Sequence, residues 1–156
     1  MRRHRTEAAD PGRPLSPAEA RQCAERAARL LAEDPRVLLV YVFGSAAHRD
    51  RGTVRDVDVA VLTDPPLSLD ALVRRRADLV AATGAAIDLV SLNEAPIVLA
   101  HEIVDAGRCL YARTPDAETA FVTRTRARYW DFKPYRDEQW RLAGERLAER
   151  RGGPQA

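Results

Sequence analysis

The sequence predicts a single α/β domain in which short apolar strands alternate with amphipathic helices, followed by a long C-terminal helical segment. Apolar runs of strand length occupy residues 37–43 and 57–62. Helical periodicity precedes, separates and follows such runs. A chain of 156 residues with 46% hydrophobic and 31% charged residues is typical of one soluble domain with its own core.

Composition excludes several classes of protein. The formal net charge is only +2, so a general nucleic-acid binder is not indicated and no direct nucleic-acid binding is expected. No apolar segment reaches 18 residues, so no membrane span is expected. The first residues, MRRHRTEAADPGRP, are basic but lack the apolar core of a secretory signal. We therefore expect a cytoplasmic protein with a disordered basic tail over residues 1–15, a domain over 16–135, and a C-terminal helix and frayed tail over 136–156.

Start and stop signals delimit the expected helices. Ser16-Pro17-Ala18-Glu19 has the pattern of a capping box, so a helix should run from there to about Glu33. Ser68 can cap a second helix, which Gly84 would end. A third strand is expected over residues 85–92, a third helix over 96–106 and a short strand over 109–111.

The last helix should begin near Thr114 and meet a proline at position 134. Pro134 is expected to kink or break it, after which residues 135–150 can continue as helix. Aromatic residues are concentrated in this segment and alternate with arginines. They fit either a protein interface or packing against the protein's own domain; they are Phe121, Tyr129, Trp130, Phe132, Tyr135 and Trp140.

The functional site is expected at the end of the first strand and the start of the second, where polar residues replace the apolar runs. The first strand stops at Gly44-Ser45, and ten residues later Asp56 and Asp58 open the second strand. Residues two apart on a strand share a face, so the two carboxylates should project together. Paired carboxylates repel unless a cation lies between them, and oxygen ligands suit Mg²⁺. Gly44 permits close backbone approach, and Ser45 with its neighbouring amides can bond phosphate oxygens. The alternative is a solvated acidic strand start after an ordinary turn.

The segment between these two motifs is charged and reads as a helical turn followed by a loop. Its His48, Arg49 and Arg51 are placed to reach phosphate oxygens, or they belong to a solvated loop.

A third carboxylate, Asp88, stands within the apolar third strand. An aspartate in such surroundings usually has a partner. That partner is either a metal shared with Asp56 and Asp58, or a nearby arginine if Asp88 faces the edge of the sheet. His101, in the third helix, is expected to be a surface or structural histidine rather than a ligand.

The order of these motifs resembles the minimal nucleotidyltransferase (MNT) family of the polymerase-beta-like superfamily, over about residues 18–135. The segment VFGSAAHRDRGTVRDVDVAVL carries the family's GSX10DXD pattern, AAIDLVSLNEAP resembles its third-carboxylate strand, and EIVDAGRCLYAR the helix and strand that follow. Arg55 departs from the serine that relatives often carry before the first aspartate. The resemblance implies a small mixed sheet flanked by helices.

Residue by residue, the resemblance implies Mg²⁺ ligation by Asp56, Asp58 and Asp88, which would also be the catalytic carboxylates. Gly44 and Ser45 would hold the phosphates of ATP, and Arg49 is a further candidate for this role. The reaction implied is in-line attack of a hydroxyl on the α-phosphorus, with Asp88 helping to deprotonate the attacking hydroxyl.

Many stand-alone MNT proteins are antitoxins encoded beside a HEPN-domain ribonuclease toxin. The resemblance thus implies an adenylyltransferase that transfers AMP from ATP to a tyrosine of the toxin, the product of the neighbouring gene, and so neutralises it. Two alternatives remain at this point. One is a nucleotidyltransferase acting on a small hydroxylated molecule such as an antibiotic, and the other is a non-catalytic antitoxin that binds its toxin.

Overall fold

In the part of the chain that the structure describes, four helices and four strands form the domain. The computed structural model describes residues 10–48 and 52–151. The helices are α1 (Pro17–Ala32), α2 (Leu69–Thr83), α3 (Ile97–Ala106) and α4 (Pro115–Arg151). The strands are β1 (Val37–Phe43), β2 (Val57–Thr63), β3 (Ile87–Ser91) and β4 (Arg108–Ala112), and a 3-10 turn, η1 (Gly44–Ala47), follows β1.

The strands form one mixed sheet in the order β3-β2-β1-β4. β1 pairs antiparallel with both β2 and β4, while β2 pairs in parallel with β3. This arrangement confirms the small mixed sheet that the resemblance implies. The parallel pair places the starts of β2 and β3 at the same end of the sheet, where β1 ends.

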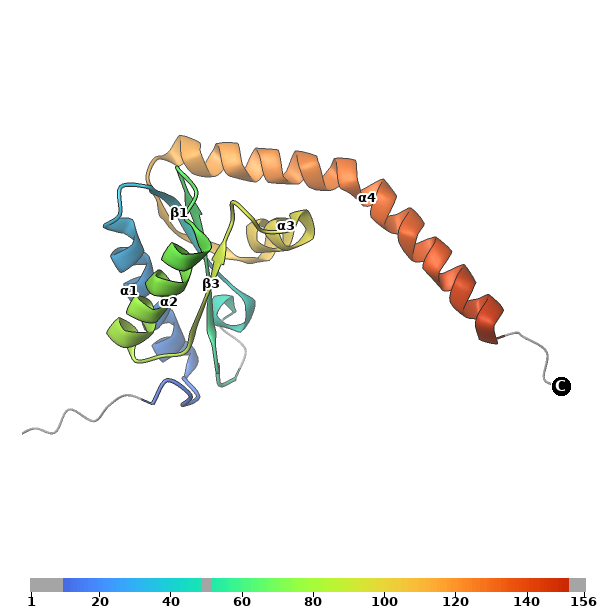
Figure 1. Ribbon diagram of the computed structural model, residues 1–156. Helices are drawn as coiled ribbons and strands as arrows, with labels where there is room; N and C mark the ends of the chain where they lie inside the picture. Colours follow the sequence, from blue (N-terminus) through green and yellow to red (C-terminus); the bar gives the residue numbers. More distant parts are fainter. Residues whose placement is uncertain (1–9, 49–51, 152–156) are drawn as a thin grey trace, which may run out of the picture.

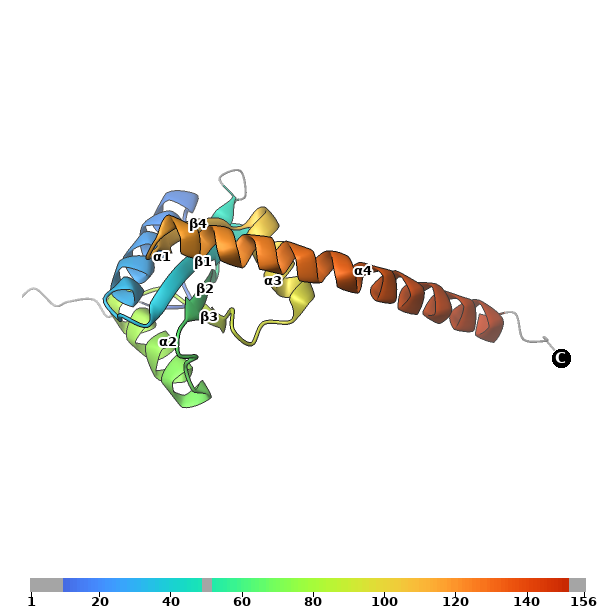
Figure 2. The same ribbon diagram turned by 90° about the horizontal axis from the view of Figure 1, so that it is seen from above.

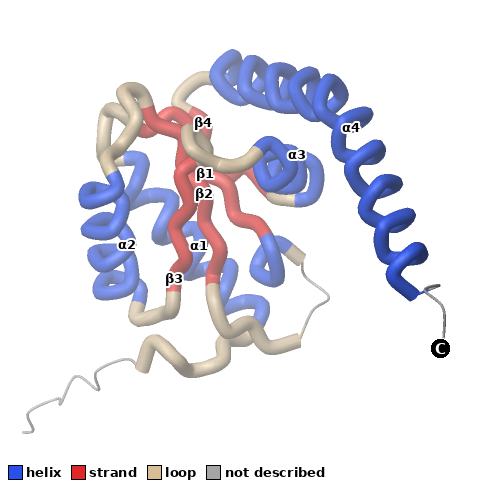
Figure 3. The backbone as a smooth tube through the Cα atoms, turned by 45° about the vertical axis from the view of Figure 1, so that its right-hand side comes forward, coloured by secondary structure: helices blue, strands red, loops and turns tan. Residues whose placement is uncertain are grey.

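Helices cover both faces of the sheet, as Figures 1 and 2 show. On one face α1 and α2 bury a core that includes Val40, Val59 and Ile87. On the other face α3 and the first part of α4 cover a second core that includes Leu39, Ala60 and Phe121. Figure 3 shows the strands running between these two layers. Because both faces are buried, β1 and β2 are apolar along nearly their whole length.

The local signals in the sequence correspond to the observed helix ends. Ser16 and Glu19 form a complete capping box, and Ser68 caps α2 by accepting from the amide of Ala71. Gly84 ends α2 with a φ of 69°, in the left-handed region that favours glycine. Within the described residues, no helix is long and apolar enough to cross a membrane.

Leu15 corrects the expected boundary of the N-terminal tail. It is buried, and its backbone exchanges two hydrogen bonds of 2.8 Å with Val54. The expectation of disorder up to residue 15 is therefore wrong for Leu15, while residues 1–9 lie outside the described part.

Pro134 lies inside α4 without interrupting it. The helix runs from Pro115 to Arg151, and Figure 1 shows its axis bending partway along. A proline cannot donate the backbone hydrogen bond to the preceding turn, so a bend at this place has an identified cause. Of the two expected outcomes, the kink is observed and the break is not.

Asp34 joins the end of α1 to β1 and α2. Its side chain is buried and accepts hydrogen bonds from the backbone N–H, Nε and Nη2 of Arg36 at 2.9, 3.1 and 2.8 Å. It also accepts from Nη2 of Arg75 on α2. The hydrogen bonds from Arg36 lower the pKa of Asp34 to about 2, with the charge of Arg75 contributing.

We expect the substitution Asp34→Asn to lower the free energy of unfolding at pH 7 by about 2 kcal/mol, because two arginines lose a charged acceptor. A carboxylate with a lowered pKa contributes stability above its ordinary pKa, and that contribution is lost as pH falls toward 2. The deficit of the variant should therefore shrink between pH 4 and pH 2. Urea unfolding at several pH values measures it, with the exposed Asp78→Asn as control. A deficit equal to that of the control at pH 7 would contradict the role given to Asp34.

Candidate active site

Gly44 allows the end of β1 to approach a carboxylate of β2. Phe43 and Asp58 are partners in the antiparallel register, so the turn after β1 begins beside Asp58. Gly44 has a φ of 63°, and a Cβ atom added to it would overlap Oδ2 of Asp58. Any other residue at position 44 would thus be strained and would displace this carboxylate.

The parallel pairing of β2 with β3 brings two of the expected site residues together. Asp58 and Asp88 are direct partners in the register, so they lie side by side on the same face of the sheet. Asp56 precedes β2 by one residue. Asp58 is half-buried, whereas Asp56 and Asp88 are exposed.

The electrostatics of Asp58 are those of a carboxylate without a compensating cation. Burial raises its pKa, and the negative charges of Asp88 and Asp56 raise it further. None of the causes of this shift is a stabilising positive charge. The fold therefore holds together carboxylates that repel one another, an arrangement that a bound cation would stabilise.

Asp88 also has the arginine neighbour that the sequence left open as an alternative. Nη2 of Arg76, on α2, lies 3.9 Å from Oδ1 of Asp88, and its Nε donates to the carbonyl oxygen of Ile87 at 2.9 Å. Both groups are more than half exposed, so this is a weak surface ion pair. Asp88 is thus placed beside Asp58 and Arg76 at once.

The donor set fits a magnesium ion, although its side chains are not gathered around one point. Carboxylate oxygens from Asp56, Asp58 and Asp88 are the ligands that Mg²⁺ prefers, and two of the three residues are exposed, which leaves room for phosphate and water ligands. Across residues 10–48 and 52–151, no three or more His, Cys, Asp or Glu side chains lie close enough together to hold a metal ion as they are placed. The metal-binding role of the three aspartates therefore stays a prediction.

A cavity of about 230 Å³ lies against Asp58 at this end of the sheet. Gly44 and Ser45 line it, as the sequence predicted for the phosphate-binding residues. His48, for which the sequence left two interpretations, also lines it, while Arg49 and Arg51 lie outside the described residues. Asp56 and Asp88 are not part of the lining. Among the described residues, the lining consists of Phe43, Gly44, Ser45, His48, Asp58, Glu102, Ala106 and Gly107.

Glu102 is the residue of this cavity that sequence reasoning missed. It lies on α3, and it reaches the cavity because α3 ends where β4 begins, beside the end of β1. Gly107 permits this close approach, since a Cβ atom there would lie 3.0 Å from the carbonyl oxygen of Val42. In the sequence, Gly107 and Arg108 mark only where α3 ends and β4 begins. They do not show which face of α3 turns toward the cavity, so they do not predict the position of Glu102. His101, expected to stay out of the site, stacks on Tyr129 of α4 with ring centroids 3.6 Å apart.

Known proteins are similar to this chain in sequence and in fold. The family described as "Polymerase beta, Nucleotidyltransferase" matches residues 25–116. The chain is 32% identical over 95 residues to the protein adenylyltransferase MntA of Shewanella oneidensis, a match that covers 61% of this chain and 68% of the relative.

Two solved structures extend the likeness. One is a complex of a tri-AMPylated HEPN toxin of Shewanella oneidensis with an MNT antitoxin, with 26% identity and a TM-score of 0.68 over 80% of this chain and 98% of the other. The second is a toxin–antitoxin with AMP-PNP, with 26% identity and a TM-score of 0.69 over 76% and 97%. With a family match across more than half of its length, the chain belongs to the polymerase beta nucleotidyltransferase family.

Proposed function

We propose that this protein is a Mg²⁺-dependent adenylyltransferase that transfers AMP from ATP to a tyrosine hydroxyl of a HEPN toxin and thereby neutralises the toxin. The 32% identical relative is a protein adenylyltransferase, and the similar solved structures are an MNT antitoxin with an AMPylated HEPN toxin and a toxin–antitoxin with an ATP analogue. Each fact concerns the relative, and the site geometry supports its transfer to this chain.

One observation carries the proposal: the β2–β3 register sets Asp58 beside Asp88, directly across from the Gly44–Ser45 turn. Phosphate-binding groups and carboxylates must meet at one place for nucleotidyl transfer, because the metal ion that the carboxylates bind also has to neutralise the negative charge of the phosphates. A solvated acidic strand start would need neither the close approach of Gly44 nor the raised pKa of Asp58.

The turn after β1 and the three aspartates would have different parts in this reaction. The hydroxyl of Ser45 and the amides of the turn would donate to phosphate oxygens at one wall of the cavity. Asp56, Asp58 and Asp88 would hold Mg²⁺, which neutralises the charge developing on the phosphates. The toxin hydroxyl forms a bond to the α-phosphorus, the bond to the β-phosphate oxygen breaks and diphosphate leaves. Asp88, which is exposed, would accept the proton of the hydroxyl.

The alternative of a small hydroxylated acceptor is less well supported. No residue of α4 lines the cavity at Asp58, so the C-terminal helix does not wall a pocket for such an acceptor there. A non-catalytic antitoxin would not need the arrangement of Asp56, Asp58 and Asp88, since the repulsion among them weakens the fold without a cation.

We expect the double substitution Asp56→Ala/Asp58→Ala to reduce AMP transfer to the HEPN protein of the neighbouring gene by roughly a thousandfold or more, because both carboxylates next to the phosphates are lost. Intact-mass spectrometry of the HEPN protein, with Mg²⁺ and ATP present, measures the number of AMP groups gained. Asp78→Ala, an exposed aspartate on α2, is the matched control and should transfer AMP as the wild type does.

A stable complex formed equally by wild type and double variant, with no mass gain in either, would instead establish a non-catalytic antitoxin. A second readout tests the metal site alone. Mg²⁺ should raise the melting temperature of the wild type and leave that of the double variant unchanged, because only the wild type has the mutually repelling carboxylates.

Substitutions of Asp88 and of its neighbour Arg76 distinguish a catalytic or metal-binding Asp88 from one that only forms an ion pair. If Asp88 accepts the proton or binds metal, Asp88→Asn should lower turnover by about a hundredfold, while Arg76→Gln should leave turnover nearly unchanged. Initial rates of AMP transfer at saturating ATP provide the comparison. Full turnover in Asp88→Asn would exclude the catalytic role, and an equal loss in both variants would assign Asp88 to the ion pair.

Gly44→Ala should lower kcat/KM by about tenfold and also lower the melting temperature. The left-handed backbone costs an alanine about 1–2 kcal/mol, and its Cβ atom would push the Asp58 carboxylate away from the phosphates. Gly52→Ala, where an added Cβ atom meets nothing within 4 Å, is the control. Wild-type kinetics in Gly44→Ala would show that the close approach has no catalytic importance.

A further inference from the structure

The final part of α4, residues 135–151, which we call the arm, presents large apolar side chains that the domain does not cover. Trp140 is 72% exposed and Leu147 is 60% exposed. No residue of the arm is buried, and Figure 1 shows the arm extending away from the domain. A helix of this length has marginal stability in water without tertiary contacts. Its exposed aromatic and aliphatic residues therefore indicate a surface that becomes covered.

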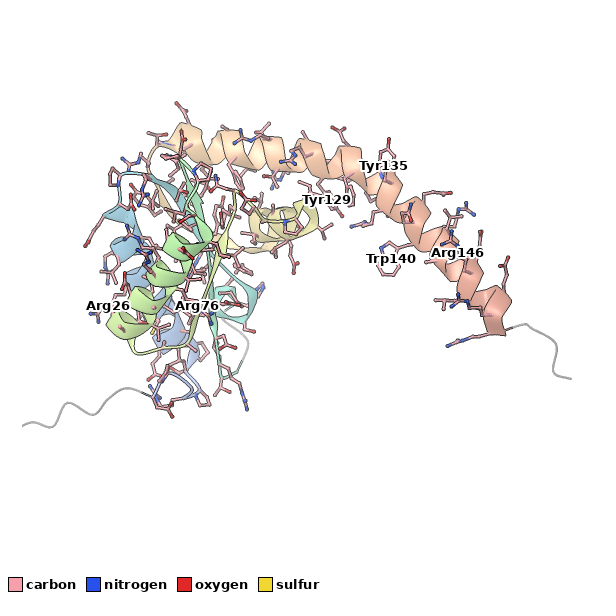
Figure 4. All side chains as sticks on the ribbon, viewed as in Figure 1. Arg26, Arg76, Tyr129, Tyr135, Trp140 and Arg146 are labelled. Atoms are coloured by element: carbon pink, nitrogen blue, oxygen red, sulfur yellow. The ribbon has the colours of Figure 1, made fainter. Side chains whose placement is uncertain are left out.

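Trp140 and Leu147 continue a stripe that begins on the domain. Tyr129, Arg136, Trp140 and Leu147 are spaced by seven, four and seven residues and share one face of the helix. At the start of the stripe Tyr129 stacks on His101 of α3, and Nη1 of Arg136 donates to the Tyr129 hydroxyl at 2.7 Å. Figure 4 shows Tyr129 and Trp140 on the inner side of the bent helix and Tyr135 on the outer side.

The start of this stripe adjoins the active site through α3. His101, which contacts Tyr129, is followed by Glu102, which lines the cavity with Asp58. A protein held against the stripe would therefore also lie beside the groups that react. A small acceptor in the cavity would not touch the arm.

We propose that the arm is a docking surface for the AMP-accepting HEPN toxin, with Trp140 and Leu147 inserting into an apolar groove of the toxin. This inference rests on the proposed function and adds a second point of attachment to it, distant from the reacting hydroxyl. Two cations lie on the same stripe: Arg151, and Arg136, which also pairs with Asp137 at 3.3 Å; their charge favours an acidic rim around that groove.

A second copy of this chain is a poor occupant for the same surface. The arm is about 25 Å long at 1.5 Å per residue and offers two large apolar side chains on the stripe. A stable dimer usually buries about 800 Å² on each partner, which is more than such a strip supplies. Antiparallel pairing of two arms that places Trp140 against Leu147 would also set Arg136 against Arg151. The toxin needs no such area from the arm, since it also contacts the active site.

The test compares Trp140→Ala/Leu147→Ala with Tyr135→Ala, an aromatic residue that is 74% exposed on the opposite side of α4. Alanine favours helix, so the arm should keep its helix content in both variants. The affinity for the HEPN protein of the neighbouring gene is measured by biolayer interferometry without nucleotide. Kinetics of AMP transfer then give kcat and the KM values for toxin and for ATP.

We expect the double variant to raise the dissociation constant and the KM for toxin by roughly 30-fold, as the loss of two interface anchors does. Its kcat and its KM for ATP should stay within about twofold of wild type, and Tyr135→Ala should match wild type throughout. A merely structural role of the stripe would lower kcat or alter the KM for ATP as well.

Equal toxin affinity in wild type and double variant would overturn the docking role while leaving AMP transfer intact. Loss of affinity in the double variant without AMP transfer by the wild type would support docking and overturn the transferase proposal. Light scattering of the protein alone provides a third outcome. A wild-type dimer that the double variant abolishes would assign the arm to a second copy and overturn the proposal.

Discussion

The parallel pairing of β2 with β3 is the constraint on which the site depends. Both faces of the sheet are buried, with Val59 in one core and Ala60 in the other, so a slip of one residue would turn Asp58 into the core under α1 and α2. The apolar residues therefore fix the place of Asp58 beside Asp88 although the two carboxylates repel. Stability comes from elsewhere in the fold, for instance from Asp34 between α1, β1 and α2, and the site can keep carboxylates that repel one another.

Sequence reasoning succeeded where the determinants are local. The capping box at Ser16, the cap at Ser68 and the stop at Gly84 each act within one helical turn. The strands next to Gly44 and around Asp58 are likewise continuous apolar runs in the sequence. It failed where tertiary packing decides: Glu102 reaches the cavity only because α3 folds back beside the end of β1, and a lone Leu15 between prolines carries no periodicity. The partner of Asp88 had two possible identities because neither Arg76 nor a metal can be positioned from sequence spacing.

The two parts of α4 differ in how far the domain covers them. Phe121 and Thr125 are buried and join the helix to the domain, whereas Trp140 and Leu147 are exposed. Helix continues past Pro134 although a proline costs about 3 kcal/mol in a helix interior. Arg141 forms ion pairs with Glu138 and with Glu145 at the spacings that support an isolated helix, although each is a weak surface pair. The arm is thus held mainly by local interactions and gains the most from a partner that covers it.

An open site and a distant docking surface are consistent with each other in physical terms. The cavity at Asp58 is small, and the neighbouring Asp56 and Asp88 are exposed to water, so the cavity alone offers little to distinguish one hydroxyl from another. Binding energy from parts of a substrate that do not react can instead hold the reacting group in place. Because Tyr129 joins the stripe of the arm to α3, and α3 supplies Glu102 to the cavity, a toxin on the arm would be positioned relative to Asp58 through the contact between α4 and α3. Selection of the acceptor would then depend on the arm, and chemistry on the carboxylates.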